Sequence, residues 1–367
     1  MKIPLTKSKF SLFQTMLDFK NIFKSNTFTS GKYVDLFQEE LKDYLNTNFA
    51  LVTSSATTAL QCAVACIPNL KLGDEILVAD FSFPASANAI SWLGYKPILV
   101  DSERYCFGME IESAEKLVTE KTKAVVAVDP FGLSPNFEKI LDFCKRHSLF
   151  LIEDAACALG SQLNNQFLGT FGKIGCLSFH PRKLVNSGEG GALISNDYKI
   201  DAQLQKLRSH GFEMSDLFPE FTLIGTNARL SEFSSALGFR QLLSINSEIE
   251  GRSKVFKYYL EELGGSSHLT FPIVPSNTKW NYQTMVLQMK SLAKRNEIVQ
   301  ALRREGVSST LGTYATHSQK AYRRFGYKPG DLPNSYNFQK TLISIPMYSH
   351  LSKVKVRKIS KIIRASL

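Results

Sequence analysis

"KAVVAVDPFGLSPNFEKILDFCKRHSLFLIED", residues 123–154, is the stretch that decides the fold class. An apolar run at its start and another at its end each have the length of a buried strand. Between them, residues 136–147 carry apolar side chains at helical spacing. A strand, a crossover helix and a second strand in this order predict two parallel strands of one sheet.

The same alternation extends upstream to residue 49. Repeated strand-then-helix units predict a mainly parallel sheet with helices on both faces. Such sheets bind ligands at the carboxyl ends of their strands, so the residues just after each strand are the first candidates for a site. The upstream strands are expected at 49–53, 75–79 and 96–101, and the helices at 56–66, 84–93 and 111–118.

The pattern changes after residue 154. Residues 174–179 and 190–196 resemble two strands without a full helix between them, and a helix is expected over 230–245. From residue 246 the chain predicts a helix, a strand at 282–289, a helix at 294–306 and a final helix. We therefore expect an α/β protein with a large domain over 1–245, which includes an N-terminal arm, and a smaller C-terminal α/β domain over 246–367.

Composition and charge narrow the class of protein. The chain has 367 residues, of which 44% are hydrophobic and 21% charged, as in ordinary globular proteins. No apolar run reaches the ~18 residues of a membrane span, and the first residues lack the apolar core of a signal peptide. We expect a cytoplasmic protein that does not contact membranes.

The formal net charge is +11, but the basic residues are dispersed. Their densest run, 352–367, has apolar side chains at helical spacing and predicts an amphipathic helix. An anionic small substrate is therefore expected rather than nucleic acid. None of the six cysteines forms a C-x-x-C pair, so no metal site and no disulfide framework are expected.

Two strand ends carry residues suited to bind an anion and a cation. SSATTAL, residues 54–60, follows the first strand and begins a helix, where free backbone N–H groups favour an anion. Plain N-capping is the simpler interpretation of this motif taken alone. Asp154 ends an interior strand, where a carboxylate is costly without a cationic partner. A helix cap or a surface position is the alternative for Asp154.

A third strand end, "SFHPRKLVNSGEGGALIS" at 178–195, combines Ser178 with Lys183 five residues later. It is not a Walker loop, because the lysine precedes the glycines. Taken alone, the lysine could equally be a solvent-exposed side chain. A fourth stretch, 225–242, places Asn227 and Arg229 just before a helix.

These segments, in this order, resemble the DegT/DnrJ/EryC1/StrS family of sugar aminotransferases, which are fold-type I enzymes that use pyridoxal 5′-phosphate (PLP). The resemblance covers nearly the whole chain, and it is the ordered set that is specific. The segments are IPLTKSKF, SGKYVDLFQEEL, SSATTAL, FSFPASANAI, VDPFGL, EDAACALGS, SFHPRKLVNSGEGGALISND, SHG, GTNARLSEFSSALGFRQL and SIPMYSHLS.

The resemblance implies a fold and two central residues. It implies a large domain with a mainly parallel seven-stranded sheet and a smaller C-terminal domain. Lys183 would hold PLP as a Schiff base and then act as general acid and base. Asp154 would pair with the protonated pyridine nitrogen, which keeps the ring an electron sink. Arg182 cannot replace the lysine, because a guanidinium stays protonated.

The resemblance also implies the surroundings of the cofactor and the substrate. Phe83 would stack on the cofactor ring. Asn227 would reach the phosphate from the partner subunit, so the active unit would be a homodimer with shared sites. The other implied cofactor contacts are Ala56, Thr57 and Ser178 on the phosphate, and the implied substrate contacts are His180, Arg229, Tyr314 and His317.

The chain departs from the family pattern at Cys157. Many members carry glutamine, histidine or glutamate at this cofactor-binding position, where the side chain hydrogen-bonds the 3′-oxygen of the cofactor. A thiol is a weak donor, so this contact is open. Ala228 and Asn186 also depart from the common residues, an aromatic and a threonine.

The implied activity is transfer of an amino group from L-glutamate to C4 or C3 of a nucleotide-linked keto-deoxysugar. The implied setting is the synthesis of surface polysaccharide, lipopolysaccharide or O-antigen. A PLP-dependent sugar dehydratase is one alternative, but those relatives have histidine in place of the catalytic lysine. The other alternative is a non-catalytic sensor or regulator, which need not keep Lys183 and Asp154.

Overall fold

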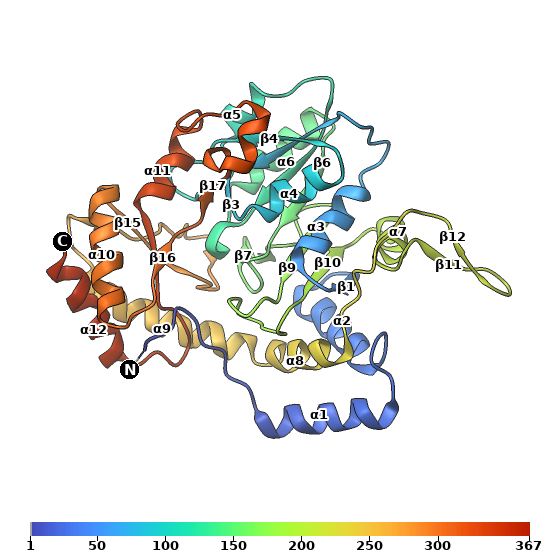
Figure 1. Cartoon of the computed structure of the whole chain (residues 1–367), viewed down its shortest axis with the longest axis horizontal. Helices are drawn as coiled ribbons and strands as arrows, with labels where there is room; N and C mark the ends of the chain where they lie inside the picture. Colours follow the sequence, from blue (N-terminus) through green and yellow to red (C-terminus); the bar gives the residue numbers. More distant parts are fainter. Residues whose placement is uncertain (1) are drawn as a thin grey trace.

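The computed structural model describes residues 2–367. Its centre is a seven-stranded sheet with the order β1-β10-β9-β6-β5-β2-β4 (Figure 1). Every neighbouring pair is parallel except the two pairs that β10 makes with β1 and β9. This confirms the predicted mainly parallel seven-stranded sheet. The strands are β1 Phe49–Thr53, β2 Glu75–Ala79, β4 Lys96–Val100, β5 Thr122–Val128, β6 Phe150–Asp154, β9 Ile174–Ser178 and β10 Gly191–Ser195.

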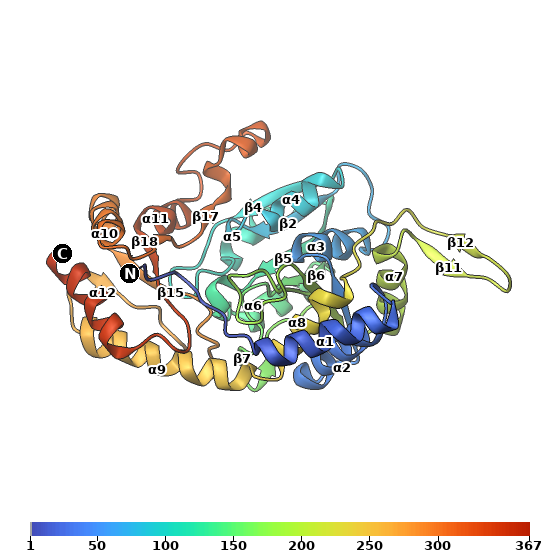
Figure 2. The same ribbon diagram turned by 60° about the horizontal axis from the view of Figure 1, so that its bottom comes forward.

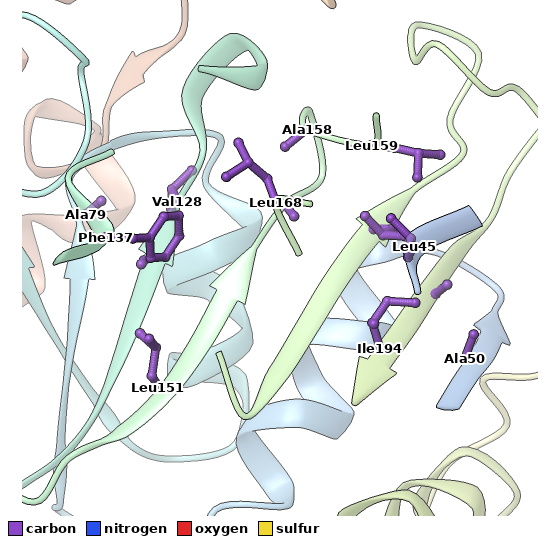
Figure 3. Packing of buried hydrophobic residues seen from close by; sticks show 14 of the residues in the cluster. Leu45, Ala50, Ala79, Val128, Phe137, Leu151, Ala158, Leu159, Leu168 and Ile194 are labelled. Atoms are coloured by element: carbon purple, nitrogen blue, oxygen red, sulfur yellow. The ribbon is translucent and has the colours of Figure 1, made fainter. Parts of the chain in front are cut away.

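Helices cover both faces of this sheet, as the strand-helix alternation predicts. Successive strand residues alternate between the two layers: Leu77 packs in one core cluster, while Ile76 and Val78 pack in the other. Figure 3 shows part of the first layer, with Leu45, Phe137 and other labelled side chains. That layer packs under α2 Lys32–Leu45, α5 Ile111–Glu115 and α6 Phe137–Arg146, and the other under α3 Ala56–Ala65, α4 Ala85–Trp92 and α7 Tyr198–Arg208.

The N-terminal helices α1 Leu12–Ser25 and α2 were not predicted from the sequence. Helix α1 runs alongside α8, Glu232–Leu242 (Figure 2). The buried carboxylate of Glu232 accepts hydrogen bonds from the backbone N–H groups of Gly31, Tyr33 and Val34. A side chain about 200 residues away in the sequence therefore caps the start of α2.

A second, four-stranded antiparallel sheet with the order β13-β15-β18-β16 lies in the C-terminal part. The predicted strand at 282–289 and all three predicted helices are present, whereas β18 was not predicted. Near the N-terminus, Ile3 pairs with Val307 and packs in the core of this part. The division at 245/246 stays a prediction. The elements are α9 Ile245–Leu263, β13 Leu269–Thr270, β15 Met285–Met289, α10 Leu292–Arg304, β16 Thr310–Leu311, β18 Leu342–Ile345 and α12 Lys353–Ala365.

Short elements join the two parts. Strand β17 pairs with β3, and β14 pairs with the β7–β8 hairpin. The β11–β12 hairpin projects from the body of the molecule (Figures 1 and 2). Within residues 2–367, no helix is both long and apolar enough to cross a membrane. These elements are β3 Phe81–Ser82, β7 Gln162–Leu163, β8 Gln166–Phe167, β11 Phe212–Met214, β12 Pro219–Phe221, β14 Thr278–Lys279, β17 Tyr314–Ala315, α11 Pro333–Thr341 and the 3₁₀ turns Pro130–Gly132, Thr316–Ser318 and Lys320–Phe325.

Candidate active site

A cavity of about 520 Å³ opens at the carboxyl ends of the parallel strands. Its walls come from the ends of β1, β5, β6 and β9, and from the C-terminal part through Thr310, Gly312 and Ser344. The structure therefore brings residues far apart in the sequence to the edge at which parallel sheets bind ligands. The predicted site residues that line it are Ala56, Thr57, Phe83, Asp154, Cys157, Ser178, His180 and Lys183.

The first turn of α3 forms one end of the cavity. Ser55 and Thr58 make a capping box, in which each side chain accepts the backbone N–H of the other at 3.1 Å. The N–H groups of Ala56 and Thr57 belong to the same turn and have no acceptor within the helix. Together with the positive end of the helix dipole, they suit an anion such as a phosphate.

Asp154 ends β6 and is only 5% exposed. Its carboxylate accepts a hydrogen bond of 2.6 Å from Ser86 Oγ and one of 3.2 Å from the Ala156 N–H. Burial raises the pKa of Asp154, and the hydrogen bond from Ser86 opposes this rise. Since no salt bridge reaches Asp154 from residues 2–367, a cation bound in the cavity would stabilise its charged form.

Lys183 reaches the same cavity from the loop after β9. Its Nζ donates to Cys157 Sγ at 2.9 Å. The backbone around the lysine is held by Gln283, whose side chain accepts from the Leu184 N–H at 2.8 Å and donates to the Arg182 carbonyl at 2.7 Å. Gln283 also lines the cavity. The sequence contained no signal for it, because it lies at a strand start 100 residues after the lysine.

His180 and Phe83 also line the cavity. His180 Nδ1 accepts from the Arg182 N–H at 3.2 Å, and burial lowers the pKa of His180. Phe83 is 67% exposed, so one face of its ring is free. Its ring lies edge-on to that of Tyr314, with centroids 6.3 Å apart.

Four predicted residues do not line the cavity. Asn227 is exposed, and its predicted contact is with a partner subunit. Arg229 lies beside the end of β1, where its backbone pairs with Thr53. Tyr314 lies on β17, with its ring next to that of Phe83. Their predicted roles stay predictions.

His317 is the fourth: it lies against Asp80 and not in the cavity wall, and its predicted substrate contact stays a prediction. Its side chain is 0% exposed, and its Nδ1 lies 2.7 Å from Asp80 Oδ2. The backbone N–H of His317 donates to the other oxygen, also at 2.7 Å. The physical reason is that Asp80, a buried carboxylate at the end of β2, needs donors.

No group of three or more histidine, cysteine, aspartate or glutamate residues in the described part of the chain could hold a metal ion. All six cysteines are free, and only Cys157 is not buried. The side chains that line the cavity offer an amine, a thiol, an imidazole, a guanidinium and carboxyl groups, next to a helix N-terminus.

The sequence model of the DegT/DnrJ/EryC1/StrS aminotransferase family matches residues 14–364. The chain is 28% identical over 342 residues to GDP-perosamine synthase from Vibrio cholerae, covering 91% of this chain and 90% of that protein. It is 29% identical over 343 residues to UDP-4-amino-4,6-dideoxy-N-acetyl-beta-L-altrosamine transaminase from Helicobacter pylori, covering 92% and 91%.

A solved structure has the same fold. The structure of Helicobacter pylori PseC, an aminotransferase involved in the biosynthesis of pseudoaminic acid, superimposes with a TM-score of 0.94 at 27% identity. The match covers 100% of this chain and 99% of that one. Both parts of the chain and their arrangement are therefore shared with that enzyme.

Proposed function

The chain belongs to the DegT/DnrJ/EryC1/StrS aminotransferase family, and from this premise we propose that it transfers an amino group from L-glutamate to a nucleotide-linked keto-deoxysugar, with PLP as cofactor. Two relatives that match over about nine-tenths of their own length are named GDP-perosamine synthase and UDP-4-amino-4,6-dideoxy-N-acetyl-beta-L-altrosamine transaminase, which supports amination of a nucleotide-linked sugar as the class of reaction. We include in this proposal that the amino group is transferred to C4 or C3 of the sugar ring. The net charge of +11 suits a diphosphate-bearing substrate.

The convergence of Lys183, Asp154 and the first turn of α3 on one cavity carries this proposal. The donor set fits PLP: an amine for its aldehyde, a buried carboxylate for its pyridinium, and free N–H groups for its phosphate. Gly191 contributes space, because a Cβ there would lie 2.5 Å from the Ala56 nitrogen. When bound, PLP supplies an electron sink that stabilises negative charge on the reacting carbon.

The cavity residues have different proposed roles toward the cofactor. The Lys183 amine would hold the cofactor and would move a proton at the reacting carbon. Asp154, whose carboxylate accepts from Ser86, would favour the protonated ring nitrogen. Phe83 would pack on the ring, and Ser178, Thr57 and the Ala56 N–H would bind the phosphate. His180, Arg229, Tyr314 and His317 remain proposed substrate contacts.

The two alternatives predict different residues. A PLP-dependent dehydratase of this family has histidine where this chain has Lys183. A non-catalytic sensor or regulator would not need both Lys183 and Asp154. The presence of both groups in one cavity favours transamination.

The first experiment follows the visible spectrum of the purified protein incubated with PLP. We expect a violet-region absorption band that disappears when L-glutamate is added and returns with a keto sugar. Borohydride reduction followed by peptide mass spectrometry should place the cofactor on Lys183. Lys183→Ala should lose the covalent label, whereas the neighbouring control Arg182→Ala should keep it. A protein that binds no PLP, or a label on another residue, would contradict the proposal.

The second experiment identifies the acceptor. GDP-, UDP- and dTDP-linked keto sugars are incubated with L-glutamate, and mass spectrometry follows the conversion of the ketone to an amine. NMR of the product then assigns the amine to C3 or C4. A sugar that loses water without gaining nitrogen would support the dehydratase instead.

We also propose a homodimer with shared sites, working in the cytoplasm in the synthesis of surface polysaccharide, lipopolysaccharide or O-antigen. Support comes from the exposed apolar side chains at the β11–β12 hairpin, because a second copy would cover such a surface. They are Met214, Leu217, Phe218, Phe221 and Ile224.

Complementation tests the shared site. Lys183→Ala and Asn227→Ala are each expected to be inactive as homodimers. When they are co-expressed, each mixed dimer has one site with both changes and one with neither, so activity should return. Full activity of Asn227→Ala alone, or no activity in the mixed dimer, would contradict sharing.

A further inference from the structure

The first residues of the chain connect the C-terminal part to the large domain. The Ile3 N–H donates to the Gly306 carbonyl, and the Ile3 carbonyl accepts from the Ser308 N–H, each at 2.9 Å. From there the chain runs to α1, which packs against α8 (Figures 1 and 2). Residues 3–11, which we call the N-terminal arm, therefore bridge the two parts.

The middle of the N-terminal arm forms part of the cavity wall. Leu5 and Thr6 line the cavity together with Met347, whose N–H donates to the Leu5 carbonyl at 2.9 Å. The loop after β9, which carries Lys183, lines the same cavity. The position of the arm relative to this loop therefore sets part of the shape of the cavity.

Asn186 connects the N-terminal arm to that loop. Its Nδ2 donates to Ser8 Oγ at 3.0 Å, while its Oδ1 accepts from the Gly188 N–H at 2.8 Å. Within residues 2–367, the only other side-chain hydrogen bond to the arm comes from Gln241, whose Nε2 donates to the Lys9 carbonyl at 2.7 Å. The bond between Asn186 and Ser8 is therefore the direct side-chain link between the arm and the loop that carries Lys183.

Asn186 is also a residue at which the chain departs from its family, in which threonine is common. A threonine offers one oxygen for both bonds, whereas an amide offers a separate donor atom and acceptor atom. With the amide, one side chain can hold the turn at Gly188 and the arm at Ser8 at the same time. The link to the arm thus depends on the residue that this chain carries.

The wall that the arm helps to form differs in charge from the rest of the cavity. Among residues 2–367, every residue that the arm and the C-terminal part contribute to the cavity is uncharged, and Thr6, Thr310 and Ser344 carry hydroxyl groups. The charged residues that line the cavity, such as Asp154 and Arg182, come from the large domain. A neutral ring with hydroxyl groups and apolar carbons suits the uncharged wall, whereas carboxylates and a diphosphate bind better near cations.

We propose that Asn186 is a positioning residue that holds the N-terminal arm, through Ser8, against the sugar ring of the acceptor substrate. The identity of this substrate rests on the proposed function, whereas the contact between Asn186 and Ser8 does not. Loosening the arm should weaken the use of the keto sugar. It should leave the use of L-glutamate unchanged, because the carboxylates of L-glutamate bind on the charged side of the cavity.

Trypsin digestion of the full-length protein measures how firmly the arm is held. Trypsin cleaves after Lys7 and Lys9, which are exposed on the arm, and cleavage requires the segment to leave the surface. Asn186→Ala leaves the sequence of the arm unchanged but removes one neutral hydrogen bond, so cleavage should be roughly 2- to 10-fold faster than in the wild type. Ser11→Ala is the matched control, because the Ser11 side chain makes no capping bond to α1, and it should keep the wild-type rate.

The double variant tests whether Ser8 and Asn186 act as a pair. Once either side chain is removed the bond is lost, so Ser8→Ala combined with Asn186→Ala should be cleaved no faster than Asn186→Ala alone. Two independent contributions would instead multiply in the double variant. That result would overturn the proposed contact.

Kinetics test the assignment of the arm to the sugar. In Ser8→Ala, kcat/KM for the keto sugar identified in the acceptor panel should fall roughly 2- to 10-fold. The kcat/KM for L-glutamate should stay within about twofold of the wild type, and so should both values in the Ser11→Ala control. An equal fall for both substrates would contradict a role toward the sugar.

The outcomes separate the two proposals. If the wild type aminates no sugar of the panel, the proposed function fails, while the trypsin rates still decide whether Asn186 holds the arm. If the wild type aminates a sugar but trypsin cleaves Asn186→Ala at the wild-type rate, only the role of Asn186 fails.

Discussion

Gly191→Ala is the sharpest test of the proposed phosphate site. Gly191 begins β10 and packs against the first turn of α3. A Cβ at this residue would lie 2.5 Å from the Ala56 nitrogen, 2.6 Å from the Ser55 carbonyl carbon and 2.7 Å from its oxygen. Favourable contacts need ~3.5 Å or more, so the backbone must shift by about 1 Å. Overpacking of this kind costs about 1–3 kcal/mol, and we expect the upper part of that range because backbone atoms cannot rotate away.

The shift also displaces the N–H group proposed to bind the phosphate. A hydrogen bond to a charged group contributes about 1.5–3 kcal/mol, so losing one should weaken PLP binding roughly 10- to 100-fold. Titration of PLP into the cofactor-free protein measures the dissociation constant. Urea unfolding of the same samples measures the loss of stability.

Gly188→Ala is the matched control in the same turn. Gly188 has φ +86°, and a methyl group added there would have no atom of residues 2–367 within 4 Å apart from those of its chain neighbours. Alanine there costs about 1–2 kcal/mol of backbone strain without displacing α3, so PLP should bind with the wild-type constant. Wild-type affinity in Gly191→Ala, or an equal loss in both variants, would refute the reasoning.

Two further predictions concern buried carboxylates away from the cavity. Glu232→Gln should lower the free energy of unfolding by about 3 kcal/mol, because Glu232 caps α2 through three backbone N–H groups. The control Glu39→Gln, at an exposed ion pair with Lys42, should change the free energy of unfolding by less than about 1 kcal/mol. Equal losses for the two variants in urea unfolding would contradict the capping role. Burial raises the pKa of Glu75, but hydrogen bonds from Thr119 and Lys96 outweigh it and lower the pKa below the usual value, so the stability difference between the wild type and Glu75→Gln should be present at pH 7 and vanish as the pH falls below about 4. Stability curves that stay parallel into acid would exclude this ion pair as the cause.

The strand-helix alternation was enough to predict the central sheet, because hydrophobic periodicity is a local property of the chain. It also predicted which residues follow the strands, and so brought Asp154, Ser178 and Lys183 toward one edge. Helices α1 and α2 were missed because α2 depends on a cap from Glu232, about 200 residues away. Strand β18 was missed because a run of three apolar residues and a serine is too short to predict a strand, and it joins a sheet only through its pairing with β15 and β16.

The site shows the same division. Gln283, which holds the backbone on both sides of the lysine, had no signal because its partners lie 100 residues upstream. The sequence likewise contained no signal for the contact between His317 and Asp80, because Asp80 lies at the end of β2, far away in the chain.

The sequence by itself determined the fold class and the residues that follow each strand, because both depend on local periodicity. The amine and the carboxylate proposed to bind PLP came from the resemblance to the family. Only the tertiary structure decided which donors reach each buried carboxyl group, because those donors come from distant segments. The backbone N–H groups of Gly169, Phe171 and Gly172 donate to Glu153, and the Ser86 hydroxyl donates to Asp154. The charge of a buried carboxyl group depends on the donors and charges around it, and the tertiary fold determines which groups those are.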